Sequence, residues 1–132
     1  MSRDLVKLHA ARLERPGMTV RCVDNGETVI VILDSFAPPN GSSYTPSIMD
    51  AVAFVVPITY PDAEPDPTGF YVRPTSLRLI GGQQLRSASI APLNGEQWLK
   101  LSWRRQAHAW DPNVDTLDGH LAIIEARFLK GE

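Results

Sequence analysis

The sequence predicts an α+β domain, with a helix near each end and an antiparallel meander of four strands between them. Three observations predict it. Apolar residues recur at helical spacing near both termini. Runs of β-branched residues joined by Asn25-Gly26 indicate a hairpin. Most of the eleven prolines lie in the middle of the chain, where they exclude long helices. The 132 residues suit one domain over residues 1–132.

The first elements are a helix and a hairpin. Periodic apolar residues predict a helix over Ser2 to Arg15, which Pro16-Gly17 ends. Two strands follow, Met18 to Val23 and Glu27 to Leu33, and the Asn-Gly dipeptide lies between them. We expect these strands to be neighbours in the sheet.

The middle of the chain alternates loops and strands. Phe36 to Ser47 contains three prolines and predicts a loop. Met49 to Ile58 is almost continuously apolar, which predicts a central strand. A proline-rich flap over Tyr60 to Pro67 separates it from a short fourth strand, Phe70 to Arg73.

The last third of the chain ends in a second helix. Residues 74 to 97 show no clear periodicity and predict an irregular, compact stretch, and Trp98 to Trp103 is interpreted as a turn of helix. Asp115 is a candidate N-cap for the final helix. Apolar residues at helical spacing (Leu117, Leu121, Ile124 and Phe128) then follow, and Lys130-Gly131 ends the helix.

The composition excludes several classes of function. Hydrophobic residues make up 43% of the chain and charged residues 21%, as in soluble globular proteins. The formal net charge of −2 argues against a nucleic-acid-binding protein. No apolar run is long enough to span a membrane. The segment from Met1 to Arg15 is charged and lacks the apolar region of a signal peptide, so we expect a cytoplasmic protein.

No constellation of residues indicates a metal or an organic cofactor. Cys22 is the one cysteine, which excludes an intramolecular disulfide and a multi-cysteine zinc site. It alternates with Val20 on the first predicted strand and is expected to point into the core. The three histidines are scattered along the chain.

Three motifs, taken with the order of the elements, resemble the E2 ubiquitin-conjugating (UBC-like) fold. The segment Tyr60 to Asp66 resembles the YPxxPP flap that follows the third strand of E2 proteins. Trp110-Asp111-Pro112 resembles the W-x-P before their crossover helix. Trp98 to Ser102 and the W-x-P-x-V-D-x-L stretch over Trp110 to Leu117 are similar to prokaryotic E2 family E. The resemblance covers nearly the whole chain.

The departure from the E2 pattern is the missing catalytic cysteine. An ordinary E2 has that cysteine eight residues before the tryptophan, where this chain has Ser102. The asparagine of His-Pro-Asn lies eight residues earlier still, where this chain has Asn94 in Pro92-Leu93-Asn94. The resemblance therefore implies Ser102 as the nucleophile and Asn94 as the oxyanion-stabilising residue, although the histidine is absent.

The implied activity is that of a ubiquitin-like-protein-conjugating acyl transferase. The protein would accept a ubiquitin-like protein from an E1-like adenylating enzyme on Ser102, as an oxyester, and transfer it to an amine. A serine needs a positioned base, for which His108 is the candidate. Arg104 and Arg105 are candidates to stabilise the negative charge of the tetrahedral intermediate.

Each assignment has a structural alternative. Ser102 is also explained as a small residue on a turn, and Asn94-Gly95 as a turn dipeptide. His108 is also explained as a surface or packing histidine, and Arg104 as part of a solvated charged face. The alternative function is a non-catalytic E2-like module that binds the ubiquitin-like protein or the E1.

The resemblance also implies a setting. Such proteins are generally encoded beside E1-like, ubiquitin-like and isopeptidase-like proteins, in bacterial conjugation operons with a possible role in antiphage defence. The expected partners are therefore an E1-like enzyme and a ubiquitin-like protein, with neither a nucleic acid nor a membrane.

Overall fold

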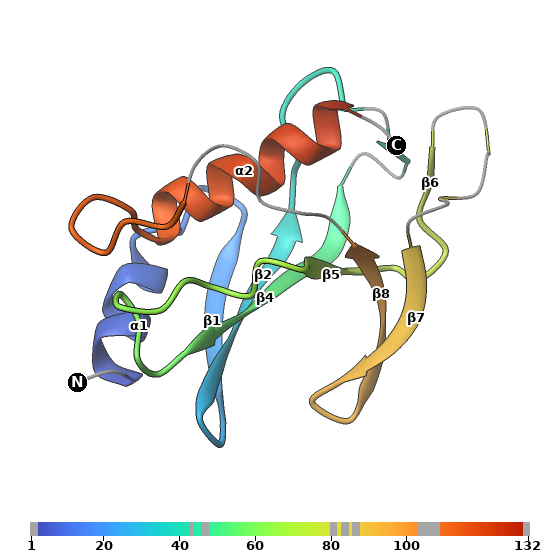
Figure 1. Ribbon diagram of the computed structural model, residues 1–132. Coiled ribbons are helices and arrows are strands. Elements are labelled where there is room, and N and C mark those ends of the chain that lie inside the picture. The colour runs from blue at the N-terminus through green and yellow to red at the C-terminus, as the bar shows by residue number, and fades with distance from the viewer. Residues whose placement is uncertain are drawn as a thin grey trace.

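A helix near each end of the chain and an antiparallel sheet between them form the protein, as a computed structural model shows (Figure 1). The structure describes residues 3–42, 44–45, 48–79, 82, 85, 88–102 and 109–130. This arrangement confirms the predicted α+β fold class. No helix in the described part of the chain is long and apolar enough to cross a membrane.

The elements follow one another in the order α1, β1 to β8, α2. The bounds are α1 Arg3–Ala11, β1 Thr19–Asn25, β2 Thr28–Phe36, β3 Tyr44–Thr45, β4 Met49–Pro57, β5 Gly69–Arg73, β6 Arg78–Leu79, β7 Ala88–Leu93, β8 Glu96–Ser102 and α2 Leu117–Lys130.

The main sheet has six strands in the order β1-β2-β4-β5-β8-β7. All its neighbouring pairs are antiparallel. β4 lies inside the sheet and is buried along most of its length, as its continuous apolar sequence predicted. β1 and β7 are the two edge strands.

The predicted N-terminal elements are present with shifted ends. Helix α1 ends at Ala11, four residues before the predicted end at Arg15. The β1–β2 hairpin is confirmed, and its turn residues are Gly26 and Glu27, since Asn25 pairs with Thr28. Gly26 has a φ of 65°, which a glycine adopts without strain. The predicted loop over residues 36–47 contains the short strand β3, which pairs with β6.

The prediction for residues 88–102 was wrong, and Trp103, the last residue of the predicted helical turn, lies outside the described residues. The segment expected to be irregular and then helical is the β7–β8 hairpin, and β8 pairs with β5 on its other side. Leu99 and Leu101 face the helix side of the sheet, while Trp98 packs on the opposite side. This alternation is the period of a strand. The hairpin extends the four-stranded meander to six strands.

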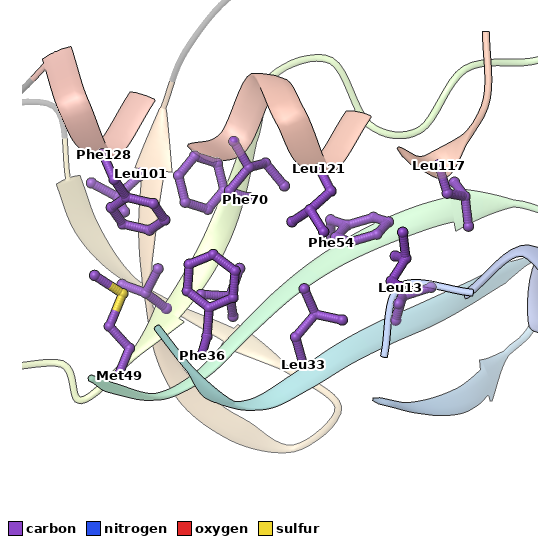
Figure 2. Close-up of a cluster of buried hydrophobic side chains, with 14 of the residues drawn as sticks. Leu13, Leu33, Phe36, Met49, Phe54, Phe70, Leu101, Leu117, Leu121 and Phe128 are labelled. Carbon is purple, nitrogen blue, oxygen red and sulfur yellow. The ribbon is translucent and has the colours of Figure 1, made fainter. Parts of the chain in front are cut away.

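Helix α2 covers one face of the sheet, called here the front face, and the main core lies between them. Figure 2 shows Leu117, Leu121 and Phe128 of α2 directed at sheet residues that include Phe54 and Phe70. All five side chains are buried. Burying one such side chain stabilises the fold by roughly 1.5–3 kcal/mol. This apolar contact therefore holds α2 against the front face of the sheet.

The opposite face of the sheet, the back face, carries a second and smaller cluster. It is built by Ile30, Ile32, Ala51, Ala53, Leu93 and Trp98. Trp98 is 1% exposed, and the guanidinium of Arg73 lies 4.9 Å from the centre of its ring. The β7–β8 hairpin thus contributes to the cores on both faces, which ties it to the rest of the sheet.

Candidate functional site

Ser102 is the last residue of β8, and its side chain is exposed. In the register with β5 it lies opposite Gly69. A Cβ atom at position 69 would lie 2.5 Å from the carbonyl oxygen of Leu101, so the backbone there leaves no room for a side chain. The glycine thus lets β5 and β8 approach closely beside Ser102, and the Lys100 side chain, whose Cε would lie 3.2 Å from that Cβ, passes over this position.

Lys100 lies on the same face of β8 as Ser102, because residues two apart in a strand share a face, and it is closer to Ser102 along the strand than Glu96, the other charged residue of β8. Its Nζ atom lies 3.5 Å from Oγ1 of Thr68 and 5.5 Å from the ring centre of Tyr71. The Thr68 hydroxyl donates in turn to Oδ1 of Asp66 at 2.6 Å. The ammonium is thus held toward the strand that faces Ser102, where a positive charge favours an oxyanion.

Sequence reasoning did not identify Lys100, Thr68 or Gly69. The available signal was the alternation in β8, which places Lys100 and Ser102 on one face once the segment is recognised as a strand. A glycine next to a strand was the second signal, because it often marks a close backbone approach.

Asn94 lies at the other end of the β7–β8 hairpin from Ser102. Asn94 and Gly95 have φ values of 52° and 77° and connect Leu93 to its partner Glu96. Positive φ at both positions is the geometry of a two-residue hairpin turn. The seven residues of β8 separate this turn from Ser102, which amounts to roughly 20 Å of strand. The structure therefore does not bring Asn94 and Ser102 together, and the backbone agrees with the turn interpretation of Asn94.

The remaining candidates near Ser102 lie outside the described residues. They are His108, Arg104 and Arg105. The other two histidines are described and belong to packed regions. His120 is buried on α2, 5.0 Å from the ring centre of Phe54, and His9 on α1 contacts Tyr60.

Cys22 does not replace the missing cysteine. It lies on β1, and three strands separate β1 from β8 in the sheet, a distance of roughly 19 Å at the usual spacing of strands. Its side chain packs against the front-face core, as predicted. Burial raises the pKa of the Cys22 thiol, which lowers the fraction of nucleophilic thiolate.

The flap and the segment before α2 meet at Tyr60. Its hydroxyl accepts a hydrogen bond from the backbone N–H of Leu117, at 3.1 Å, and lies 2.6 Å from Nδ1 of His9. The indole N–H of Trp110 donates to the Pro61 carbonyl at 2.7 Å. These bonds join α1, the flap and the first residue of α2. The two sequence motifs Tyr60 to Asp66 and Trp110 to Pro112 therefore form one structural junction.

Electrostatics at this junction favour neutral side chains. Burial lowers the pKa of His9, and the positive charge of Arg12 lowers it further, against a smaller opposite effect of Asp118. Burial also raises the pKa of the Tyr60 hydroxyl. A neutral His9 can accept a hydrogen bond from the Tyr60 hydroxyl at Nδ1, while the backbone N–H of Leu117 donates a hydrogen bond to the hydroxyl oxygen.

The described residues contain no group of three or more histidine, cysteine or acidic side chains placed to hold a metal ion. The described groups at Ser102 are its own hydroxyl and the Lys100 ammonium.

The comparisons with known proteins give a family match. The model of a family described as "Prokaryotic E2 family E" matches residues 5–130. No curated protein and no solved structure matches the chain. The matched range runs from α1 to the last turn of α2, and it includes the flap, Ser102 and the Trp110 motif.

Proposed function

Because this chain belongs to prokaryotic E2 family E, we propose that it is the E2-type component of a ubiquitin-like conjugation pathway and carries the modifier on Ser102. An E1-like enzyme and a ubiquitin-like protein are its partners in this proposal. The observation that carries it is the position of Ser102, exposed at the end of β8 and facing a glycine. An acyl group the size of a peptide tail needs a nucleophile that is exposed, as Ser102 is.

The proposed carriage is an acyl transfer between two partners. The Ser102 oxygen attacks the thioester carbonyl that joins the modifier to the E1-like enzyme. A C–O bond forms and the C–S bond breaks, and the departing thiolate takes up the proton that the serine loses. An amine of the target then attacks the oxyester and releases the Ser102 hydroxyl.

Lys100 supports this proposal through its charge. The tetrahedral intermediate carries a negative oxygen, and a positive group already held nearby stabilises that charge without reorganisation. Asn94 has no part in the step, because the length of β8 separates it from Ser102. His108 and Arg104 remain proposed as base and charge-stabilising group, since both follow Ser102 closely in sequence.

A charging assay tests the proposal. The protein is incubated with its E1-like partner, the ubiquitin-like protein of the same operon and ATP, and adducts are followed by gel and intact mass. We expect an adduct that resists reducing agent, is cleaved by strong base and is missing in Ser102→Ala. In Ser102→Cys the adduct should become sensitive to reducing agent, because a thioester replaces the oxyester.

Asn94→Gly is the matched control in the same assay. Glycine adopts the positive φ of the hairpin turn, so this variant keeps the fold and loses only the side-chain amide. We expect it to be charged as efficiently as the wild type. An adduct that persists unchanged in Ser102→Ala would refute carriage on Ser102.

The second candidate is a non-catalytic module that binds the ubiquitin-like protein or the E1. The separation of Asn94 from Ser102 favours it, because the described residues then offer Ser102 no side-chain amide for the oxyanion. In that case no adduct forms although the E1 is charged, and wild type and Ser102→Ala bind the ubiquitin-like protein with equal affinity.

A further inference from the structure

The outer edge of β7 offers unpaired backbone groups. β7 ends the sheet (Figure 1), and no described segment pairs with it on the side away from β8. Its sequence, Ala-Ser-Ile-Ala-Pro-Leu, contains no charged residue. Natural edge strands commonly carry charges that prevent pairing with other chains. The β7 edge lacks this protection along all six of its residues.

The turn decides which backbone groups face outward. In a two-residue hairpin the pair that closes the turn, Leu93 and Glu96, exchanges hydrogen bonds, and bonded and non-bonded pairs then alternate. Ala88, Ile90 and Pro92 accordingly direct their backbone groups away from β8. Pro92 has no N–H to offer and fits at such a position. Within the described part of the chain, the N–H groups of Ala88 and Ile90 and the three carbonyls pair with no other strand, and an added strand could use them.

An apolar pocket runs beside this edge on the front face. Its volume is about 260 Å³, and its lining includes Leu77, Leu85, Ile90 and Leu99. Ile90 is 57% exposed, whereas Leu77, Leu85 and Leu99 are at most 7% exposed. A partner strand paired with β7 would place alternate side chains over this pocket. Because the leucines and Ile90 make up much of the lining, beside Thr75, Arg78 and Ser89, the partner that fits is an extended peptide with an aliphatic side chain.

The geometry points to the C-terminal tail of the ubiquitin-like protein as that peptide. This inference rests on the proposed function. β7 begins at the Ser102 end of the hairpin, since Ala88 pairs with Leu101. A strand added antiparallel to β7 runs from Leu93 toward Ala88, so its C-terminus emerges at the end where Ser102 lies.

The spacing of strands gives the expected register of the tail. The added strand lies two strand spacings from β8, or about 10 Å. An extended chain covers this distance in about three residues. The last three residues of the tail therefore span the distance from the outer edge of β7 to Ser102. The residues just before them pair with Ala88 and Ile90. The β7 edge in this way aligns the reacting carbonyl with the serine.

Ile90→Pro is the most selective variant for testing this inference. The Ile90 N–H faces outward, so proline removes the donor to the tail without breaking the β7–β8 ladder. Ile90→Asp adds a charge that opposes burial of an aliphatic side chain. Ile48→Asp is the matched control, because Ile48 is also exposed, at 60%, and does not line the pocket.

The measurement is binding of the ubiquitin-like protein of the same operon, full length or lacking its last six residues, to the purified full chain. We expect truncation of the tail, Ile90→Pro and Ile90→Asp each to weaken binding about tenfold or more. Ile48→Asp should bind like the wild type. Hydrogen exchange should slow at the Ala88 and Ile90 amides when the full-length protein binds. Melting temperatures check that the variants are folded.

The outcomes separate this inference from the proposed function. If Ile90→Pro, correctly folded, or the truncated protein binds as tightly as its parent, docking on β7 is overturned, whether or not Ser102 is charged. Absence of binding to the wild type overturns it as well. If binding depends on Ile90 while no adduct forms on Ser102, the β7 edge is upheld and carriage on Ser102 is refuted.

Discussion

At the scale of single residues, Gly69 is a position near the proposed site that has no room for a side chain. The space that a Cβ would need is taken by the backbone carbonyl of Leu101. A backbone atom cannot move aside as the end of a flexible side chain can, so any larger residue must separate β5 from β8. Ser102, which pairs with Gly69, would shift with that separation.

We expect Gly69→Ala to lower the free energy of unfolding by about 1–3 kcal/mol, because the added methyl group overlaps the Leu101 carbonyl. Gly119→Ala is the matched control. Nothing lies within 4 Å of a Cβ at position 119 in α2, so this change should stabilise the protein by up to about 1 kcal/mol. Urea denaturation of the two variants measures both effects. Equal stabilities would contradict the close approach at Gly69.

At the scale of elements, the junction at Tyr60 connects segments that are distant in sequence. The Tyr60 hydroxyl is bonded to the first residue of α2 and to His9 of α1. Tyr60 itself is 1% exposed. An unsatisfied backbone N–H in such a place costs about 1–3 kcal/mol, so the hydroxyl helps to determine where α2 begins. His9 in turn makes this junction dependent on pH.

The lowered pKa of His9 predicts a loss of stability in acid. Because the folded state favours the neutral ring, the full contribution of His9 is present above the unfolded pKa of about 6.5. It is lost as the pH falls from that value through the lower folded pKa. We expect His9→Gln to remove this part of the pH dependence. The measurement is the free energy of unfolding of both proteins between pH 8 and pH 5.

The comparison of the two proteins isolates His9, since both keep His108 and His120. A wild type whose stability falls in parallel with that of His9→Gln over this range would show that protonation of His9 does not oppose folding. Arg12 and Asp118, whose charges act on His9 in opposite directions, are unchanged in the variant.

At the scale of the whole molecule, α2 and the sheet stabilise each other through the front-face core. Phe128 lies at one end of this contact, with its ring centre 5.3 to 5.6 Å from those of Phe36, Tyr44 and Phe70. These rings come from β2, β3 and β5. One side chain of α2 therefore contacts both the six-stranded sheet and the two-stranded β3–β6 sheet, and its loss should affect the whole fold.

Phe128→Ala should lower the free energy of unfolding by about 3–5 kcal/mol, because it leaves a cavity among aromatic rings that cannot close around it. Leu129→Ala, at the next position, should cost less than about 1 kcal/mol, since Leu129 is 46% exposed. Chemical denaturation followed by circular dichroism compares the two variants. A similar loss in both would mean that α2 packs through a different face.

The sequence by itself determined the elements whose pattern is local. Helical periodicity placed α1 and α2, β-branched runs placed β1 and β2, and a continuous apolar run placed β4 inside the sheet. The family resemblance drawn from the flap and the Trp110 motif is confirmed by the family match. Each of these patterns depends on the burial of residues that are close together in the sequence, on one face of a helix or on both faces of a central strand such as β4, so it can be recognised from the order of residues alone.

Only the tertiary structure decided the surroundings of Ser102. The segment from Trp98 to Ser102 becomes a strand through its pairing with β5 and β7 and through burial on both faces. Asn94-Gly95 was a usable hairpin signal, but counting eight residues between Asn94 and Ser102 could not give their distance. Eight residues bring two side chains close across a loop and keep them roughly 20 Å apart along a strand. Whether residues 94–102 form a loop or a strand depends on the pairing of β8 with β5, which is distant in sequence. That pairing cannot be read from the residues of the segment itself.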